Sequence, residues 1–355
     1  MIQVISLFSG CGGLDLGISK ENSDLISSLE IDQDCCRTLE LNKKKFFPTS
    51  KVLQADIQEV VKFSSRDLLM ARDKKKPLMI IGGPPCQPFS KNGYWITNNK
   101  RLKDLDPRNH ISSFFKVVEQ TKADAFLLEN VESILHPSNR HAAEGITEIT
   151  KTLGFEPQLL KLNACEYGVP QKRKRVFFLG TRGKFKSTNI APTHRDYSKK
   201  INQDFFDNLP NFLGVKDFIK EFSKEEFQEK EENCQEGTYY EELKMIPPGE
   251  NYLHLTEKKG FKDPKFIYGT RFWNFLLKLH PDQPSWTIAA TPGPWVGPFH
   301  WNNRRLRVPE IAAIQTFPKN YKFEGNRRSV QKQIGNAVPP KLAAKVLEHL
   351  QESLI

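Results

Sequence analysis

Short apolar runs alternate with longer amphipathic segments along the first half of the chain. The runs are rich in β-branched and aromatic residues and predict strands; they span residues 4–8, 25–30, 51–54, 78–81, 125–129, 158–162 and 176–180. Residues 32–42, 110–122 and 142–153 have the apolar spacing that predicts helices. The alternation predicts an α/β fold with a parallel, doubly wound sheet and crossover helices.

This alternation stops near residue 182. The charged run IKEFSKEEFQEKEEN follows; we interpret it first as a solvated helix face and second as a contact surface. Segments rich in Pro, Gly and aromatic residues, such as MIPPGENYLHL, then predict a separate, loop-rich domain. Helical spacing returns in VPEIAAIQTF and PPKLAAKVLEHL, so the C-terminus is expected to pack back onto the first domain. The expected divisions are 1–182, 183–285 and 286–355.

The composition favours a polyanionic partner. The formal net charge is +11, which favours nucleic acid because no amphipathic membrane anchor is visible. The start MIQVISLF lacks the basic residues of a signal peptide, and the apolar runs fall short of the roughly 20 residues that span a bilayer. The cysteines have no framework or zinc-ligand spacing; they are Cys11, Cys35, Cys36, Cys86, Cys165 and Cys234. We expect a soluble cytoplasmic protein without disulfides, metal or membrane contact.

A pocket for a nucleoside is predicted where the first three strands end. LFSGCGGLDLG (7–17) is a glycine-rich turn between a strand and a helix, and such a turn alone also has a purely structural interpretation. Glu30 ends the next strand, where a carboxylate suits a ribose, and Asp56 ends the third, where one suits an exocyclic amine. No phosphate-binding loop with Gly-Lys-Ser/Thr follows. An adenosyl group without phosphates therefore fits best.

A reactive thiol is predicted in GGPPCQPFS (82–90). Pro84 and Pro85 fix the backbone before Cys86, and a stiff turn can aim a nucleophile. Glu129 follows an apolar strand, and the basic run QKRKR (171–175) precedes another. Each feature alone also fits a buried cysteine, a helix cap or a solvated edge. Together, and in this order, they favour a catalytic site.

The sequence resembles the DNA (cytosine-5) methyltransferases, prokaryotic restriction-modification type. The matching motifs are LFSGCGGLDLG, GGPPCQPFS, ENV, QKRKR, RRLRVPEIAAIQTFP and QIGNAVPP, in the family's order. They cover residues 1–182 and 286–355. The resemblance implies an S-adenosylmethionine-dependent, Rossmann-like methyltransferase fold with a smaller, loop-rich target-recognition domain between QKRKR and RRLRVPE.

The resemblance also implies the site residues. For S-adenosylmethionine, Phe8 would stack on adenine, Glu30 would hold the ribose, Asp56 the adenine amine, and Asn336 would close the pocket. The full implied cofactor set is Phe8, Ser9, Gly10, Cys11, Gly12, Gly13, Glu30, Ile31, Asp56, Ile57 and Asn336.

The implied catalytic residues are Cys86, Glu129, Arg173 and Arg175. Cys86 would add to C6 of a cytosine flipped out of the duplex, and Glu129 would hold N3 and the exocyclic amine. Arg175 would bind the carbonyl, with Arg173 supporting the same loop.

Ser90 and Gln171 would contact DNA, and the polar segment after the nucleophile would close over the flipped base. Arg271 is one candidate for reading base edges. The segment DPRNHISSFF departs from the family at Asn109 and His110, and RRLRVPE departs at Val308 and Pro309.

Three alternatives remain at this point. A tRNA cytosine methyltransferase would carry Cys-Phe-Thr in its variable region, whereas Cys234 lies in ENCQEG. An amino-methyltransferase would need Asp/Asn-Pro-Pro-aromatic in place of PPCQ. A binding-only module would not need the Cys86 and Glu129 pair. We expect a monomer that methylates double-stranded DNA within a restriction-modification system, with a cognate endonuclease as a possible partner.

Overall fold

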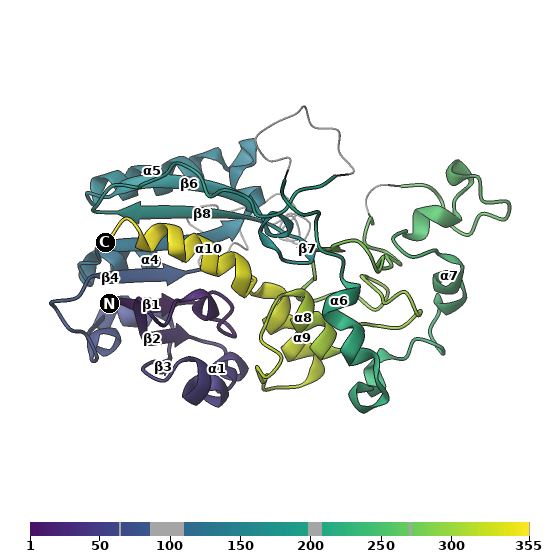
Figure 1. The fold of residues 1–355 in the computed structure, drawn as a ribbon, viewed down its shortest axis with the longest axis horizontal. Coiled ribbons are helices and arrows are strands. Elements are labelled where there is room, and N and C mark those ends of the chain that lie inside the picture. The colour runs from purple at the N-terminus through teal and green to yellow at the C-terminus, as the bar shows by residue number, and fades with distance from the viewer. Residues whose placement is uncertain (64, 86–109, 198–207, 270–271, 355) are drawn as a thin grey trace.

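A seven-stranded mixed sheet forms the centre of the computed structural model, which describes residues 1–63, 65–85, 110–197, 208–269 and 272–354 (Figure 1). All seven expected strands are present. In sheet order they are β3 (Lys51–Gln54), β2 (Ser23–Glu30), β1 (Ile2–Leu7), β4 (Leu78–Gly82), β5 (Ala125–Val131), β8 (Lys174–Thr181) and β6 (Glu156–Asn163).

The prediction of an all-parallel sheet was wrong for β8. This strand is antiparallel to both β5 and β6. Only about ten residues separate β6 from β8, too few for the crossover helix that a parallel neighbour requires. β8 is buried over most of its length, so its apolar run has the same appearance as that of a buried parallel strand.

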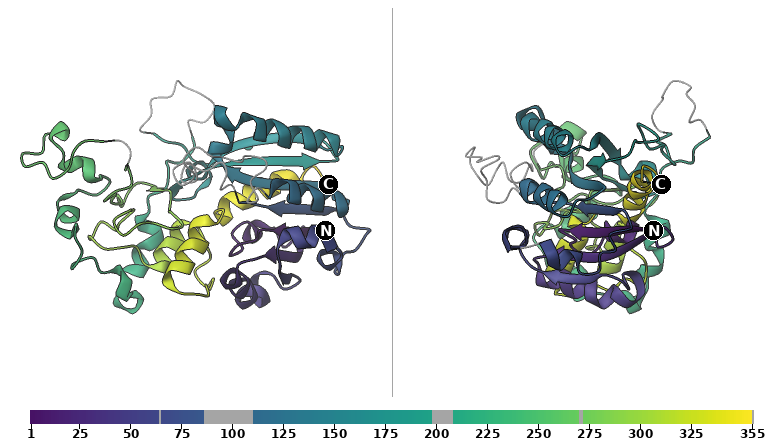
Figure 2. Two further views of the ribbon diagram at one scale, coloured as in Figure 1. Left: turned by 180° about the vertical axis from the view of Figure 1, so that it is seen from behind. Right: turned by 90° about the vertical axis from the view of Figure 1, so that its left-hand side faces the viewer.

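Helices cover both faces of the sheet (Figure 2). Successive strand residues point to opposite sides: Val4 and Met79 pack with the C-terminal helices, whereas Ile5 and Ile80 pack with α4 and α5. The expected doubly wound α/β fold is confirmed. The helices are α1 (Gln33–Phe46), α2 (Ile57–Phe63), α4 (Ile111–Gln120), α5 (Arg140–Thr152), α6 (Lys216–Ile219), α7 (Tyr240–Met245), α8 (Val308–Ile314), α9 (Arg327–Asn336) and α10 (Pro340–Gln351).

The C-terminal segment returns to the sheet, and α10 runs along one face of it (Figure 1). Pro340 starts this helix, a position where its missing N–H costs nothing. Val346, Leu347 and Leu350 are buried in the same cluster as Ile2 of β1. The first strand and the last helix therefore share one core.

The loop-rich region has a small core of its own. Leu243, Tyr252 and Leu276 are buried there with Phe299, and Trp295 packs against them. This cluster extends past residue 285, the expected end of the domain. The region is joined to the sheet domain by a two-residue parallel pairing of β7 (Gln171–Lys172) with β9 (Ser285–Trp286).

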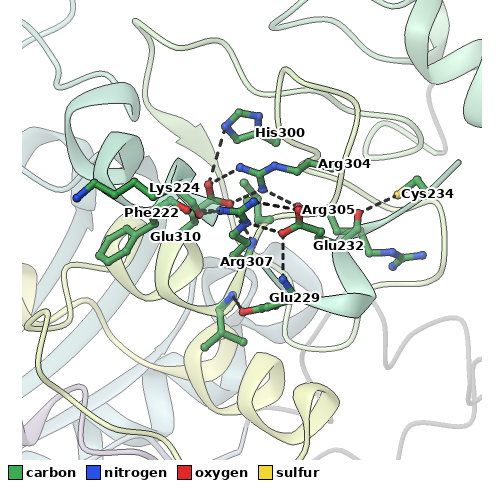
Figure 3. A network of polar contacts seen from close by, with 12 residues as sticks. Phe222, Lys224, Glu229, Glu232, Cys234, His300, Arg304, Arg305, Arg307 and Glu310 are labelled. Carbon is green, nitrogen blue, oxygen red and sulfur yellow. Dashed lines mark hydrogen bonds and ion pairs between the residues drawn. The ribbon is translucent and has the colours of Figure 1, made fainter. Parts of the chain in front are cut away.

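The charged run 219–233 is not the continuous solvated helix that we expected first. It forms the end of α6 and separate 3₁₀ turns. Glu225 and Glu226 are exposed, but Glu229 and Glu232 turn towards α8 and α9 (Figure 3). The basic partners lie 75 or more residues later, so the local charge pattern could not show them. The second interpretation, a contact surface, describes the part of the run that contains Glu229 and Glu232.

Arg307 is the centre of these contacts (Figure 3). Its guanidinium pairs with Glu232 and donates to the carbonyl oxygens of Phe222, at 2.6 Å, and Lys224, at 2.7 Å. Glu229 accepts from Arg327 Nε at 3.0 Å and from the backbone N–H of Val308. This network fixes the start of α8 to the loop-rich region.

A buried carboxylate supports the glycine-rich turn after β1. Asp15 accepts from Ser6 Oγ at 2.5 Å and from Ser28 Oγ at 3.4 Å, which ties the turn to β1 and β2. Burial raises the pKa of Asp15 from 3.8 to about 7, because little water remains to stabilise its charge.

We expect Arg307→Met to lower the free energy of unfolding by about 3–5 kcal/mol, because Glu232 and two carbonyls lose a buried partner. Urea denaturation measures the change. Lys345→Met is the matched control, since Lys345 pairs with Glu348 at 2.9 Å on the surface and should contribute less than about 1 kcal/mol. Equal losses in both variants would contradict the interpretation.

We expect Asp15→Asn to flatten the pH dependence of stability. In the folded state the pKa of Asp15 is about 7, whereas in the unfolded state it has its ordinary value of 3.8. The folded state therefore binds a proton more tightly, and the stability that this gives is complete below pH 3.8 and is lost as pH rises through 7. The variant should therefore exceed the wild type at pH 8 by up to a few kcal/mol, and this difference should vanish near pH 4. Urea titrations from pH 4 to 8 measure it, with the exposed Asp263→Asn as control. A constant difference across this range would refute the assignment.

Candidate active site

Glu30 joins the turns that follow β1 and β2. Its Oε2 accepts the backbone N–H of Gly10 at 2.7 Å, and its Oε1 accepts those of Ile31 and Asp32 at 2.8 and 2.9 Å. Three donors fix the carboxylate at the carboxyl edge of the sheet. Oε1 already has two donors, whereas Oε2 has one and keeps a second lone pair that can accept a hydroxyl from a ligand.

The glycine-rich turn has an open side and a closed side. A Cβ at Gly10 would meet no atom within 4 Å, whereas one at Gly13 would lie 2.5 Å from the carbonyl oxygen of Val338. Cys11 is buried: its thiol donates to the carbonyl of Gln333 at 3.3 Å, and its own carbonyl accepts from Tyr321. The turn thus packs on the C-terminal motif and leaves Gly10 beside free space.

The other residues of the expected cofactor set also fall into two groups, exposed residues and buried ones. Ile31 is 61% exposed, an unusual position for a large apolar side chain, and Asp56 accepts the N–H of Gln58 at the start of α2. Ser9 and Ile57 are buried and shape the backbone. Asn336, the last residue of α9, is exposed.

Phe8 directly follows β1 and is half-buried; its positive φ of 55° breaks the strand conformation at the start of the glycine-rich turn. The ring lies 5.8 Å from that of His110, centroid to centroid. His110 is one of the departures from the family pattern, so this departure lies beside the expected adenine position.

A second cluster lies where β4, β5 and β8 meet. Arg175 Nε is 2.7 Å from Glu129 Oε1, and both side chains are 12% exposed. A Cβ at Gly83 would lie 3.0 Å from Glu129 Oε2, so any larger residue there would push this carboxylate away from its place. Pro84 is buried and Pro85 exposed as the chain leaves the sheet. Cys86, Ser90 and Arg271 lie outside the described residues.

Two opposing effects set the protonation of Glu129. Burial raises its pKa above the ordinary 4.5, and the neighbouring charges of Arg175 and Arg173 oppose this rise. A buried carboxyl beside a cation can both accept and hold a proton near a bound base.

Arg173 is fully buried, in contrast to Arg175. Its Nη2 donates to the carbonyl of Gly335 at 2.8 Å, and its Nη1 to that of Ile288 at 3.5 Å. Burial, together with the charge of Arg175, lowers its pKa well below 12.5. Arg173 therefore joins the strand segment to α9 and to the residues after β9.

Gln171 does not lie on the surface where a DNA contact was expected. It has no exposed area, its amide nitrogen donates to Gln315 at 3.0 Å, and its amide oxygen accepts the N–H of Ile288 at 3.2 Å. A side chain held in this way cannot contact DNA from this position. The partners lie 117 and 144 residues later, and the sequence motif gave no sign of them.

Two residues that support the site were missed in the sequence. Asp15 anchors the glycine-rich turn to β1 through Ser6. The sequence pattern that could have indicated this role is an acidic residue within the apolar stretch LDLG. Gly83 leaves room for the Glu129 carboxylate. The sequence pattern that could have indicated this role is the pair of glycines before Pro-Pro.

The part of the chain that the structure describes contains no group of three His, Cys, Asp or Glu side chains placed to hold a metal ion. Within the same residues, each helix is too short or too polar to cross a membrane. The five described cysteines are free and buried.

Solved structures with the same fold cover nearly the whole chain. A putative DNA modification methyltransferase encoded in an E. coli prophage aligns with a TM-score of 0.66 at 22% identity, covering 100% of this chain and 99% of that one. The Dnmt2 methyltransferase of S. pombe aligns with a TM-score of 0.63 at 16% identity, with the same coverage. These likenesses show the fold.

Sequence comparisons identify the family. The Type II methyltransferase M.SacI of Streptomyces achromogenes is 37% identical, over 99% of this chain and 93% of that protein. M1.HphI of Haemophilus parahaemolyticus is 33% identical, over 98% and 86%. The family model "C-5 cytosine-specific DNA methylase" matches residues 2–352. The chain therefore belongs to the C-5 cytosine-specific DNA methylases.

Proposed function

We propose that this DNA cytosine-5 methyltransferase works through a covalent bond between Cys86 and a cytosine flipped out of duplex DNA. The observation that carries the proposal is the Glu129–Arg175 pair, 2.7 Å apart, against Gly83 at the start of the turn that leads to Cys86. The pair and the turn come from three adjacent strands of one rigid sheet, which holds reacting groups at fixed positions.

The residues at the first cluster fit S-adenosylmethionine. Gly10 adjoins free space, the Glu30 carboxylate suits a ribose, Ile31 offers an exposed apolar side chain to a ring, and Asp56 suits an amine. Phe8 and Asn336 complete the set. The buried Ser9, Cys11, Gly12, Gly13 and Ile57 shape the backbone around it. When bound, the cofactor supplies an electrophilic methyl group.

The protein's own residues activate the cytosine. The Cys86 thiolate adds to C6, Glu129 in its protonated form donates a proton to N3, and the resulting neutral enamine makes C5 nucleophilic. Once C5 has taken up the methyl group, loss of the C5 proton to a base and of the Cys86 thiolate from C6 restores the aromatic ring and frees the thiolate. Arg175 binds the carbonyl of the base and holds Glu129, while Arg173 is a positioning residue that fixes this segment on α9.

We infer the biological setting from relatives such as M.SacI and M1.HphI, which are Type II methyltransferases. We propose that the chain protects double-stranded DNA in a restriction-modification system, as a monomer with a cognate endonuclease. Residues 183–285 would form most of the target-recognition domain, with the aromatic cluster around Phe299 as its core.

We expect wild-type protein, incubated with labelled S-adenosylmethionine and duplex DNA containing 5-fluorocytosine, to form a stable labelled adduct. The fluorine blocks the final elimination. Cys86→Ala should form none, because the bond to C6 cannot form. Glu129→Gln should slow methylation of ordinary DNA by about 10²- to 10⁴-fold, the usual contribution of a positioned proton donor. Denaturing electrophoresis and single-turnover rates measure the two effects.

Cys234→Ala is the matched control, since it removes a buried thiol from the loop-rich region. This variant should form the adduct, and Cys86→Ala should still bind S-adenosylhomocysteine. An adduct in Cys86→Ala would refute the covalent role of this residue.

A further inference from the structure

Two tryptophans form an exposed pair on the loop-rich region. Trp273 and Trp286 are 43% and 37% exposed, and their rings lie 5.7 Å apart, centroid to centroid, at 72°. The Nζ of Lys172 lies 4.9 Å from the ring centroid of Trp286. Exposed large aromatic side chains of this kind mark interaction sites. The two rings meet edge to face, and we refer to Lys172, Trp273 and Trp286 together as the tryptophan stack because we consider the rings as a surface on which a base can stack.

The tryptophan stack is rigidly placed. Lys172 and Trp286 are paired residues of β7 and β9. Thr287 Oγ1 also donates to the carbonyl of Lys172 at 2.8 Å, and Gln171 and Arg173 on either side of Lys172 are buried. The indole of Trp286 is therefore held at the surface by residues that are themselves fixed.

The tryptophan stack lies close to the proposed cytosine pocket. Lys172 and Arg175 are three residues apart in a nearly extended segment, which corresponds to about 10 Å. Arg175 contacts Glu129 directly. About three stacked bases of DNA span the same distance, since bases along one strand are about 3.4 Å apart.

The chemistry of the tryptophan stack fits nucleic acid. Indole faces stack on bases, and a lysine beside them meets the phosphate backbone. The net charge of +11 favours the same partner.

We propose that the tryptophan stack contacts the DNA next to the methylated cytosine, with Trp286 stacking on a neighbouring base and Lys172 pairing with a phosphate. This inference rests on the proposed function and adds a contact that positions the substrate. The inference predicts different effects for the two residues. Trp286 should add affinity for DNA through stacking, whereas Lys172 should make DNA binding more dependent on salt concentration through its phosphate contact.

The test uses a duplex oligonucleotide from a DNA fragment that the wild-type protein methylates. Trp286→Ala should raise its Kd about 10- to 100-fold, and Trp286→Phe, which keeps an aromatic face, should recover most of the affinity. Lys172→Gln should lower the slope of log K against log salt by about 1. S-adenosylhomocysteine binding and melting temperature should stay at wild-type values in all three.

Met70→Ala is the control, because Met70 is 69% exposed and adjoins Ala71, which contacts Gln3 near the amino ends of the strands, away from the site. It should leave the Kd for DNA unchanged. An unchanged Kd in Trp286→Ala, or equal loss in Trp286→Ala and Trp286→Phe, would overturn the proposal. No methylation of any duplex by the wild type would refute the proposed function itself.

Discussion

The buried guanidinium of Arg173 is the contact on which the arrangement of the site depends. It has no exposed surface, yet it joins the segment before β8 to the carbonyls of Ile288 and Gly335. Burying a cation costs several kcal/mol unless good partners compensate. Here the carbonyls and the charge of Glu129 offset part of this cost, although burial still lowers the pKa of Arg173 well below 12.5. The same group therefore links the cytosine pocket, the C-terminal motif and the entrance to the loop-rich region.

Arg307 makes a comparable connection at the other end of the interface. It binds Glu232 and two carbonyls of the loop-rich region, and Glu229 accepts the N–H of Val308. Pro309 is tolerated beside it because the first turn of a helix does not use its N–H groups. The departure from the family at Val308 and Pro309 therefore fits the local structure of α8.

The sequence predicted what is local and periodic. The strands, the two-sided helical cover and the nearness of Gly10 to Glu30 all follow from apolar runs and from the rule that strand ends share one edge. It could not predict the direction of β8, because burial on both faces looks alike in either orientation. It also failed for Gln171 and for Glu229, whose environments are set by residues 79 to 144 positions away. Such contacts leave no local pattern.

The electrostatics of Glu129 connect the fold to the chemistry. Burial favours its protonated form and raises its pKa, whereas the charge of Arg175 favours its ionised form and opposes that rise. DNA that covers the site would remove the remaining water, which increases the cost of an isolated charge and strengthens the attraction between Glu129 and Arg175. Protonated Glu129 can then donate to N3 of the bound base, and Arg175 stays beside the carboxylate that remains. The proposed mechanism needs this balance, and one buried carboxylate between a proline-fixed turn and an arginine supplies it.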